Sequence, residues 1–391
     1  MRSTVLTPKG EIRMRNVTAR VFLLLISISF AGGQASSVPP TRLAHLRHGI
    51  NLSEWFAQVY DPRGYTKEHF QDWTTSTDIA LIKSAGFDHV RLSVNPQPMM
   101  EAELRADGGA EYFRYLDAAM KMILDAGLAV ELDMHPDSDF KARLAKEDDF
   151  VERFADFWRG VAQHYASWDA DQVFFEILNE PEMRNPYRWH GVEAKLAAAV
   201  RQGASNHTII AAGARWDDDD DMIFLEPLRD PNVIYVFHFY EPHIFTHQGA
   251  TWGAYYWRWV KGLHYPSTPD NAAQVATAVP EAVHRLDVIR YGQDHWNAER
   301  IEAEINQAAD WAKQNGVPLI CNEFGVFRRF ADPQDRAQWI TEVRSSLERH
   351  NIGWAMWDYS GSFGVVTKKD GRAMLDETTV RALGLKVPGK Q

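Results

Sequence analysis

The stretch VFFEILNEP, residues 173–181, decides the fold of this chain. It is a short run of apolar, strand-forming residues that ends in the polar side chains of Asn179 and Glu180. Seven further runs of this kind occur along the sequence, and helical stretches lie between them. The predicted strands are 48–53, 89–94, 129–135, 173–180, 208–214, 233–240, 318–326 and 353–360. Short strands that alternate with helices indicate a parallel sheet.

Amphipathic helices are predicted between these strands. The clearest are 111–127, 151–167 and 335–351, in which apolar residues recur three and four positions apart. The first of them ends at Gly127, a residue typical of helix C-termini. Eight strands with intervening helices predict an α/β fold of the (β/α)8 kind, a TIM barrel. We expect residues 45–391 to form this barrel as a single domain.

The connection between the sixth and seventh predicted strands, residues 241–317, is enlarged. It contains the aromatic-rich run TWGAYYWRWV, residues 251–260, and a further tryptophan, Trp296. Because loops of TIM barrels build active sites, this connection can form a wall of a substrate cleft. It can equally form a helical subdomain that buries its own aromatic residues, and the sequence leaves both interpretations open.

The composition excludes several classes of protein. With 391 residues, of which 45% are hydrophobic and 12% aromatic, the chain is too apolar to be disordered. Its formal net charge of −11 disfavours nucleic acid and anionic membranes as partners, but a neutral polysaccharide is indifferent to it. The 14 tryptophans suit a sugar-binding cleft as well as an ordinary core. Cys321 is the single cysteine, so an intramolecular disulfide is impossible.

The N-terminal residues 1–35 are predicted to be a signal peptide. The short apolar run 21–32 follows basic residues, and small residues follow it at Gly33 and Ala35. An uncleaved membrane anchor is the alternative, although the run is short for a bilayer span. Met14 is a second candidate for the start of translation. We expect a secreted or periplasmic protein, with residues 36–44 as a short leader before the barrel.

Reactive groups of TIM-barrel enzymes lie at the C-terminal ends of the strands. The polar or aromatic residues at those positions are Arg91, His135, Asn179, Glu180, His238, Tyr240, Glu323 and Trp357. Two of them, Glu180 and Glu323, are carboxylates, and a pair of carboxylates across a barrel mouth suits glycoside hydrolysis. A separation of about 5–5.5 Å allows one carboxylate to attack the sugar and retain its configuration. Glu323 should stay ionised beside Arg91 and Tyr240, and Glu180 should hold a proton against the charge of Glu323.

The motifs ILNEP (177–181) and NEFGV (322–326) resemble the acid/base and nucleophile strands of the family 5 glycoside hydrolases, the cellulase family. The segments HVRLS (89–93), DMHP (133–136), HFYEP (238–242) and WAMWDYS (354–360) follow in the order that this family requires. The resemblance covers residues 45–385. An isolated NEP is common, so the ordered set of motifs on successive predicted strands carries the resemblance.

The resemblance implies a role for each matching residue. Glu180 would be the acid/base, Glu323 the nucleophile, and Asn179 a hydrogen-bond partner of the 2-hydroxyl in subsite −1. Arg91 and Tyr240 would hold Glu323 ionised and oriented. His238 would lie near the acid/base and the sugar, Trp357 would be the platform under the −1 sugar, and His135 matches the histidine of the third strand. Pro136 departs from the polar residue of many relatives, which puts the subfamily in doubt.

Other interpretations of single residues remain open. Arg91 could form a structural ion pair, His135 and His238 could be core histidines, Asn179 could cap a turn, and Trp357 could be barrel packing. Glu54 could contact a distal sugar or be structural, and Cys321 is expected to be a small buried residue. The acidic run 217–221 could bind calcium or form a solvated loop. Histidines 238, 243 and 247 lack the spacing of strong zinc motifs, so no metal and no cofactor are expected.

We therefore expect a retaining glycoside hydrolase that cleaves β-1,4-linked glucan by double displacement, as an endoglucanase does. The partner would be a β-linked polysaccharide or oligosaccharide, and the protein is expected to be a monomer. The alternatives are an endo-β-1,4-mannanase, another β-glucan hydrolase of the same fold, a non-catalytic glycan-binding barrel and a metal-dependent barrel hydrolase. Specificity resides in loops, so the motifs leave the substrate open.

Overall fold

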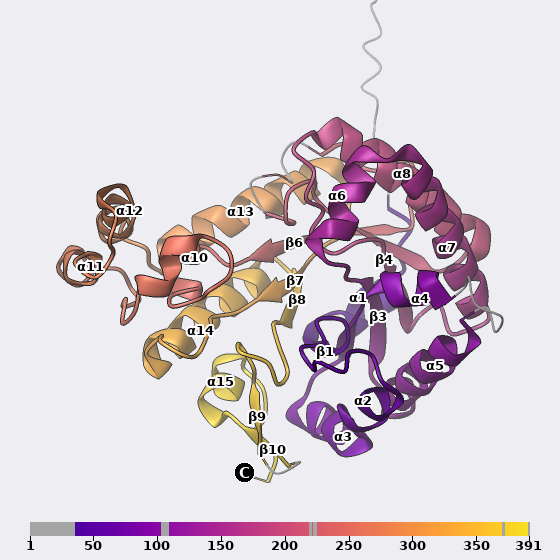
Figure 1. Ribbon diagram of the computed structural model, residues 1–391, viewed down its shortest axis with the longest axis horizontal. Helices are drawn as coiled ribbons and strands as arrows, with labels where there is room; N and C mark the ends of the chain where they lie inside the picture. Colours follow the sequence, from indigo (N-terminus) through magenta and orange to yellow (C-terminus); the bar gives the residue numbers. More distant parts are fainter. Residues whose placement is uncertain (1–35, 103–108, 219–220, 222–224, 370–371, 390–391) are drawn as a thin grey trace, which may run out of the picture. The chain divides into compact units, whose positions relative to one another are not determined.

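The computed structural model confirms the predicted TIM barrel. It describes residues 36–391 except 103–108, 219–220, 222–224, 370–371 and 390–391. Among these residues, eight parallel strands close into a barrel in the order β1 to β8 (Figure 1). The strands are β1 His48–Phe56, β2 His89–Val94, β3 Ala129–Met134, β4 Val173–Glu176, β5 Thr208–Ala211, β6 Val233–Phe239, β7 Leu319–Phe324 and β8 Gly353–Met356.

Several strands are shorter at their C-terminal ends than predicted. Strand β4 ends at Glu176, although the apolar run continues to Leu178. Backbone hydrogen bonds to the neighbouring strands continue beyond this end, from Ile177 N–H to Ile210 and from Asn179 N–H to Met134, and Glu180 then adopts a positive φ of 45°. Residues 177–180 thus form the turn above the barrel that carries Asn179 and Glu180, because functional residues of this fold lie on the loops after the strands.

Helices surround the barrel and match the predicted positions. They include α2 Lys67–Asp72, α3 Ser76–Ala85, α4 Pro96–Ala102, α5 Ala110–Asp125, α6 Ser138–Lys146, α7 Asp148–Tyr165, α8 Pro186–Gly203, α13 Ala298–Asn315 and α14 Pro333–Arg349. Side-chain caps fix where several of them begin: Asp137 accepts from the third residue of α6, and Asn185 and Asp332 act similarly at α8 and α14. The three clearest predicted helices correspond to α5, α7 and α14.

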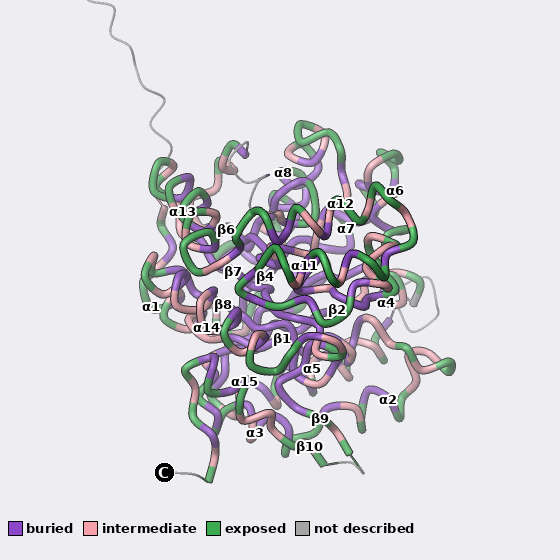
Figure 2. The backbone as a smooth tube through the Cα atoms, turned by 90° about the vertical axis from the view of Figure 1, so that its left-hand side faces the viewer, coloured by how far each residue is buried: buried purple, intermediate pink, exposed green. Residues whose placement is uncertain are grey.

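The strands are buried on both faces, and the exposed residues lie mostly on the helices (Figure 2). Tryptophans attach the outer helices to the turns above the strands. The indole N–H of Trp158 on α7 donates to the carbonyl of Ile177, and that of Trp189 on α8 donates to Ala212, each at 2.9 Å. These buried indoles hold the turns that carry the polar residues.

Residues 36–44, predicted to be a short leader, are part of the folded unit. Helix α1, Pro40–His45, carries the buried side chain of Arg42. Its guanidinium contacts Asp171 at 2.8 Å, the carbonyl of Asn206 at 2.6 Å and the hydroxyl of Thr208 at 3.0 Å. Arg42 thus joins the N-terminal helix to the strand starts of the barrel. The signal-peptide prediction for residues 1–35 lies outside the described residues.

The enlarged connection between β6 and β7 is in part a helical subdomain and in part a wall of the cleft, so each of the two interpretations is partly correct. It contains α10 His243–Thr246, the 3-10 helix η1 Tyr255–Trp259, α11 Pro269–Ala276 and α12 Ala282–Gln293. Helices α11 and α12 lie outside the ring of barrel helices (Figure 1) and bury residues such as Val279 and Tyr291. Trp252 and Trp257 of the same connection line a cleft at the barrel mouth.

The C-terminal part adds a two-stranded antiparallel sheet, β9 Val366–Lys369 and β10 Arg372–Leu375, and helix α15, Glu377–Ala382. In the described part of the chain, no helix combines the length and the hydropathy needed to cross a membrane.

Gly353, at the start of β8, provides a test of how closely β8 packs against the chain at Leu46. An added Cβ would lie 1.9 Å from the backbone carbonyl oxygen of Leu46, which cannot move freely. We expect Gly353→Ala to lower the free energy of unfolding by about 1–3 kcal/mol. The matched control is Gly160→Ala on α7, where an added Cβ meets no atom within 4 Å among the described residues. The control should be neutral or stabilising by up to about 1 kcal/mol. Equal thermal midpoints for the two variants would contradict this account.

Candidate active site

A cleft of about 990 Å³ lies at the C-terminal ends of the barrel strands. Seven of the eight predicted site residues line it: His135, Asn179, Glu180, His238, Tyr240, Glu323 and Trp357. The eighth, Arg91, lies beneath them with no exposed surface and contacts two of them. The structure therefore brings the whole predicted set together.

Arg91 organises the floor of the cleft. Its guanidinium donates to Glu323 at 2.5 Å, to Glu176 at 2.6 and 2.7 Å, and to the side-chain oxygen of Asn179 at 2.9 Å. Asp133 lies 3.1 Å away. Burial lowers the pKa of Arg91, but the charges of Asp133, Glu176 and Glu323 raise it well above its usual value. Arg91 thus carries a permanent positive charge inside the barrel, shared among several carboxyl groups.

Three buried acidic residues around Arg91 were not predicted. Glu131 and Asp133 on β3 and Glu176 on β4 have no exposed surface. Burial raises the pKa of Glu131 well above its usual value and that of Asp133 to about 6, so both carboxyl groups hold a proton to higher pH than they would in water. Asn322 donates to both Glu131 and Glu176. The signal in the sequence was a charged residue inside an otherwise apolar strand.

Glu323 is held by two donors on opposite oxygens. Arg91 donates to Oε1, and the hydroxyl of Tyr240 donates to Oε2 at 2.8 Å. Both contacts stabilise the carboxylate form and fix its orientation. Cys321, two residues earlier on β7, is fully buried with its sulfur 3.4 Å from the carbonyl oxygen of Glu323, in line with the small buried residue that was expected.

Glu180 faces Glu323 across the imidazole of His238. His238 Nδ1 lies 3.0 Å from Oε1 of Glu180 and 3.5 Å from Oε2 of Glu323. One carboxylate oxygen of each glutamate and a nitrogen of His238 all lie within 4.8 Å of one another. This spacing suits direct attack by one carboxylate, since carboxyl groups that leave room for a water between them and the sugar stand about 6.5–9.5 Å apart.

The proton in the free site lies elsewhere than predicted. Burial raises the pKa of Glu180, but the hydrogen bond and the charge of His238 lower it to about 2. Burial lowers the pKa of His238, but Glu323, Glu180 and Asp217 raise it to about 9. The expectation that the charge of Glu323 keeps Glu180 protonated is therefore wrong for the free protein. The imidazole between the carboxylates compensates that charge and holds the proton itself.

His135 and Trp357 form one side of the site. The two rings stack with centroids 5.6 Å apart and planes inclined by 16°. His135 Nδ1 lies 2.8 Å from Asp133, and its Nε2 lies 3.2 Å from the amide nitrogen of Asn179. Burial lowers the pKa of His135 to about 3, so it is neutral and can accept from Asn179. The amide of Asn179 is thereby fixed between His135 and Arg91.

Aromatic residues line the outer part of the cleft, and two of them, Tyr60 and Trp216, were missed by sequence reasoning. Trp216 and Trp252 are 54% and 46% exposed, and Tyr60 is 77% exposed, so flat faces are available to a ligand. Trp216 follows β5, and its position after a strand was the signal that could have identified it. Lys141 on α6 also lines the cleft, 3.4 Å from Glu182.

Glu54, at the end of β1, is outside the residues that line the cleft. Burial and, to a smaller extent, the charge of Asp358 raise the pKa of Glu54 to about 7. The acidic run 217–221 is not simply a solvated loop, because Asp217 is fully buried and Asp221 pairs with Arg215. Residues 219 and 220 lie outside the described part, so the calcium interpretation stays a prediction.

Within the part of the chain that the structure describes, two groups could offer three ligand atoms to a metal ion: Glu176, Asp217 and His238, and Glu180, His238 and Glu323. In the first group both oxygens of Glu176 already accept from Arg91. In the second, Arg91 and Tyr240 occupy the two oxygens of Glu323. Each group therefore shares one carboxylate with the hydrogen bonds of Arg91.

Comparison with known proteins agrees with this geometry. The family model described as Cellulase (glycosyl hydrolase family 5) matches residues 54–362. Endoglucanase C of Acetivibrio thermocellus is 29% identical over 327 residues, which cover 81% of this chain and 92% of that protein. Cellodextrinase A of Ruminococcus flavefaciens is 25% identical over 314 residues, which cover 78% of this chain and 82% of that protein.

Solved structures give the same result. The structure of Thermotoga maritima Cel5A in complex with cellobiose has a TM-score of 0.71 and 26% identity, and covers 88% of this chain and 100% of that chain. The complex of the same protein with a mannotriose substrate has a TM-score of 0.71 and 25% identity, with the same coverage.

The charge of His238 in the free site can be measured directly. Because His238 holds its proton to a pKa of about 9, its imidazole should remain charged through neutral pH, while His135 stays neutral. In Glu180→Gln the pKa of His238 should fall, since one of the charges that raise it is removed. Nitrogen NMR titration of histidine-labelled protein, with His238→Gln to assign the signal, checks both points. A neutral His238 at pH 7 in the unsubstituted protein would refute this assignment.

Proposed function

The chain belongs to glycosyl hydrolase family 5, the cellulase family, and on that premise we propose that it is an endo-acting β-1,4-glucanase that retains the anomeric configuration of its product. The observation that supports this mechanism is the approach of the Glu180 and Glu323 carboxylates to within 4.8 Å, with His238 between them. The spacing agrees with double displacement, in which one carboxylate attacks the sugar.

In the first step Glu323 attacks the anomeric carbon of the −1 sugar. The bond from that carbon to the leaving oxygen breaks, and Glu180 gives its proton to the leaving sugar. Arg91 and Tyr240 hold the attacking carboxylate in place through their two hydrogen bonds. In the second step Glu180 takes a proton from a water molecule, the water oxygen attacks the anomeric carbon, and Glu323 is released.

The proton that Glu180 donates comes from His238 in this proposal. In the free site His238 and Glu180 form an ion pair at 3.0 Å. A sugar in the cleft displaces water, and an ion pair becomes less stable relative to its neutral form as the surroundings become less polar. Transfer of the proton from Nδ1 to Glu180 then leaves a neutral imidazole and a protonated acid, the form that the first step needs.

The remaining predicted residues bind the sugar. Asn179, which contacts Arg91 and His135, binds the 2-hydroxyl of the −1 sugar in this proposal, and Trp357 lies under the ring of that sugar. Trp216 and Trp252 offer exposed faces along the cleft, which suits an extended neutral chain. The names of the relatives favour glucan, and the Thermotoga complex with mannotriose makes β-1,4-mannan the second candidate substrate.

In this proposal the protein is also exported, is a monomer and needs no cofactor. The apolar run 21–32 after basic residues supports export, and a polymeric substrate requires an enzyme outside the cytoplasm. The acidic balance of the chain suits a neutral glycan rather than nucleic acid or an anionic membrane surface.

The roles of the two glutamates can be separated by chemical rescue. Glu323→Ala should lower kcat by at least about 1000-fold, and azide should restore turnover with an α-glycosyl azide as product. Glu180→Ala should lose about 100-fold or more on cello-oligosaccharides, and azide should then yield the β-glycosyl azide. Glu226→Gln, at an exposed position, is the control and should keep full activity. Proton NMR of early products from the unsubstituted protein should show the β-anomer; an initial α-anomer contradicts the retaining mechanism.

The substrate can be assigned with a panel of polysaccharides. We expect faster release of reducing ends from carboxymethylcellulose and lichenan than from galactomannan or xyloglucan, with a rapid fall in viscosity because the cleft admits internal parts of a chain. Trp216→Ala should raise KM on these polymers roughly 10-fold, since one stacked ring contributes about 1–2 kcal/mol. Faster cleavage of galactomannan than of any glucan would assign the enzyme to mannan instead.

A further inference from the structure

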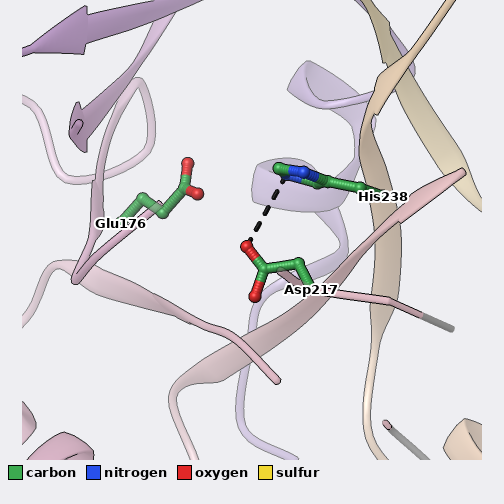
Figure 3. A group of neighbouring side chains, drawn as sticks. All are labelled: Glu176, Asp217 and His238. Atoms are coloured by element: carbon green, nitrogen blue, oxygen red, sulfur yellow. Dashed lines mark ion pairs between the residues drawn. The ribbon is translucent and has the colours of Figure 1, made fainter. Parts of the chain in front are cut away.

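Asp217 is a buried carboxyl group behind the imidazole of His238 (Figure 3). Its Oδ2 lies 3.7 Å from Nε2 of His238 and accepts the backbone N–H of Glu180 at 2.8 Å. Its backbone carbonyl accepts the N–H of His238, also at 2.8 Å. One residue therefore contacts both members of the pair between which the acid proton is held.

We propose that Asp217 is a positioning residue for the reaction, the third member of a chain Asp217–His238–Glu180 that keeps the acid proton available to Glu180. The inference rests on the proposed function, because it concerns how that reaction obtains its proton. Asp217 acts through His238 and does not contact the sugar.

The orientation of the imidazole supports this chain. Nδ1 faces the two glutamates, and Nε2 faces Asp217 at a distance slightly longer than a hydrogen bond. Among the described residues, Nε2 has no hydrogen-bond partner, and neither does Oδ1 of Asp217. A charged imidazole has a donor on each nitrogen, and a buried donor requires an acceptor. A small rotation of Asp217 would supply it.

Among the acidic groups near His238, Asp217 is the one whose charge is not offset by Arg91 and that faces Nε2. The acidic groups near His238 are Glu180 after β4, Glu323 on β7, Asp133 on β3, Glu176 on β4 and Asp217 after β5. Glu323, Asp133 and Glu176 also contact Arg91, which offsets their charge. The acidic groups near Asp217 itself are Glu176, also held by Arg91, Glu180 and Glu193 on α8.

The titration of Asp217 and His238 agrees with a shared proton. Burial raises the pKa of Asp217 well above its usual value, and the charge of His238 lowers it. Burial lowers the pKa of His238, and the charge of Asp217 is among those that raise it. Each group thus changes the proton affinity of the other.

The proton transfer balances within the chain. The Nδ1–H bond of His238 breaks, an O–H bond forms on Glu180, and the electron pair stays on Nδ1. The Nε2–H bond of His238, on the side of Asp217, stays intact. Glu180 then passes its proton to the leaving oxygen, and in the second step the proton taken from water returns to Nδ1 through Glu180.

The local backbone explains why an aspartate lies here. Trp216 and Asp217 both have positive φ angles, 52° and 55°, a region that aspartate tolerates better than most residues. The same turn places Trp216 in the cleft, and Trp216 N–H donates to the carbonyl of Pro181 at 2.9 Å. The turn thus joins the segment after β5 to the segment that carries Glu180.

The test compares two substrates that share one sugar part. Asp217→Asn keeps the size of the side chain and an acceptor for the Glu180 N–H, but it removes the charge that holds the proton on His238. Phenyl β-cellobioside needs protonation of its leaving group, and 2,4-dinitrophenyl β-cellobioside does not. We expect kcat/KM of the variant to fall on the order of 10-fold to 100-fold for the phenyl substrate and less than about 3-fold for the dinitrophenyl substrate.

The pH dependence gives a second readout. Because Asp217 raises the pKa of His238, its neutralisation should let the stored proton leave at lower pH. The basic limb of kcat/KM for phenyl β-cellobioside should therefore move to lower pH in Asp217→Asn. A purely structural role would lower the activity on both substrates by the same factor and leave this limb in place, and that result overturns the proposal.

The matched control is Asp221→Asn, which removes the ion pair with Arg215 in the same loop without contact to His238. It should change both rates by one common factor. The ratio of the two rates is measured on one sample, so a reduced folded fraction of either variant does not affect it. If the unsubstituted protein cleaves neither cellobioside, the proposed function fails. If it cleaves both and Asp217→Asn leaves their ratio unchanged, only the role of Asp217 is overturned.

Discussion

The charge of Arg91 is the constraint on which the active site depends. It lies at the centre of the barrel mouth without exposed surface and contacts carboxyl groups from β3, β4 and β7. A buried cation is stable only when it is paired, and each buried carboxylate here needs the same partner. The guanidinium, which offers five donors in a fixed plane, satisfies several of them at once and so sets where Glu323 and Asn179 point.

The fold and the central pair could be predicted from sequence because both leave local signals. Alternating strands and helices indicated the barrel, and the polar residues at the strand ends located Glu180 and Glu323. The predicted end of the fourth strand was less accurate, because apolar residues 177 and 178 continue the pattern after the regular strand has ended at Glu176. Hydrophobicity indicates burial, and these two residues are buried although they follow the regular strand.

The protonation of the site could not be predicted because it depends on distances between segments far apart in the chain. Asp217 belongs to a run of acids that looks like a solvated loop, and only the turn with positive φ at Trp216 and Asp217 buries it behind His238. Likewise, the charge of Glu323 alone argues for a protonated Glu180. The imidazole between them, at 3.0 and 3.5 Å, reverses that conclusion for the free site.

Helix α1 has a consequence for maturation of the protein. Arg42 ties this helix to the carbonyl of Asn206 and to Thr208 at the opposite end of the barrel from the cleft. A peptidase that removed this arginine would leave Asp171 without its counter-ion. It would also remove the contact that covers the start of β5 at Thr208. The position of Arg42 therefore limits how far proteolytic processing can proceed from the N-terminal side without loss of stability.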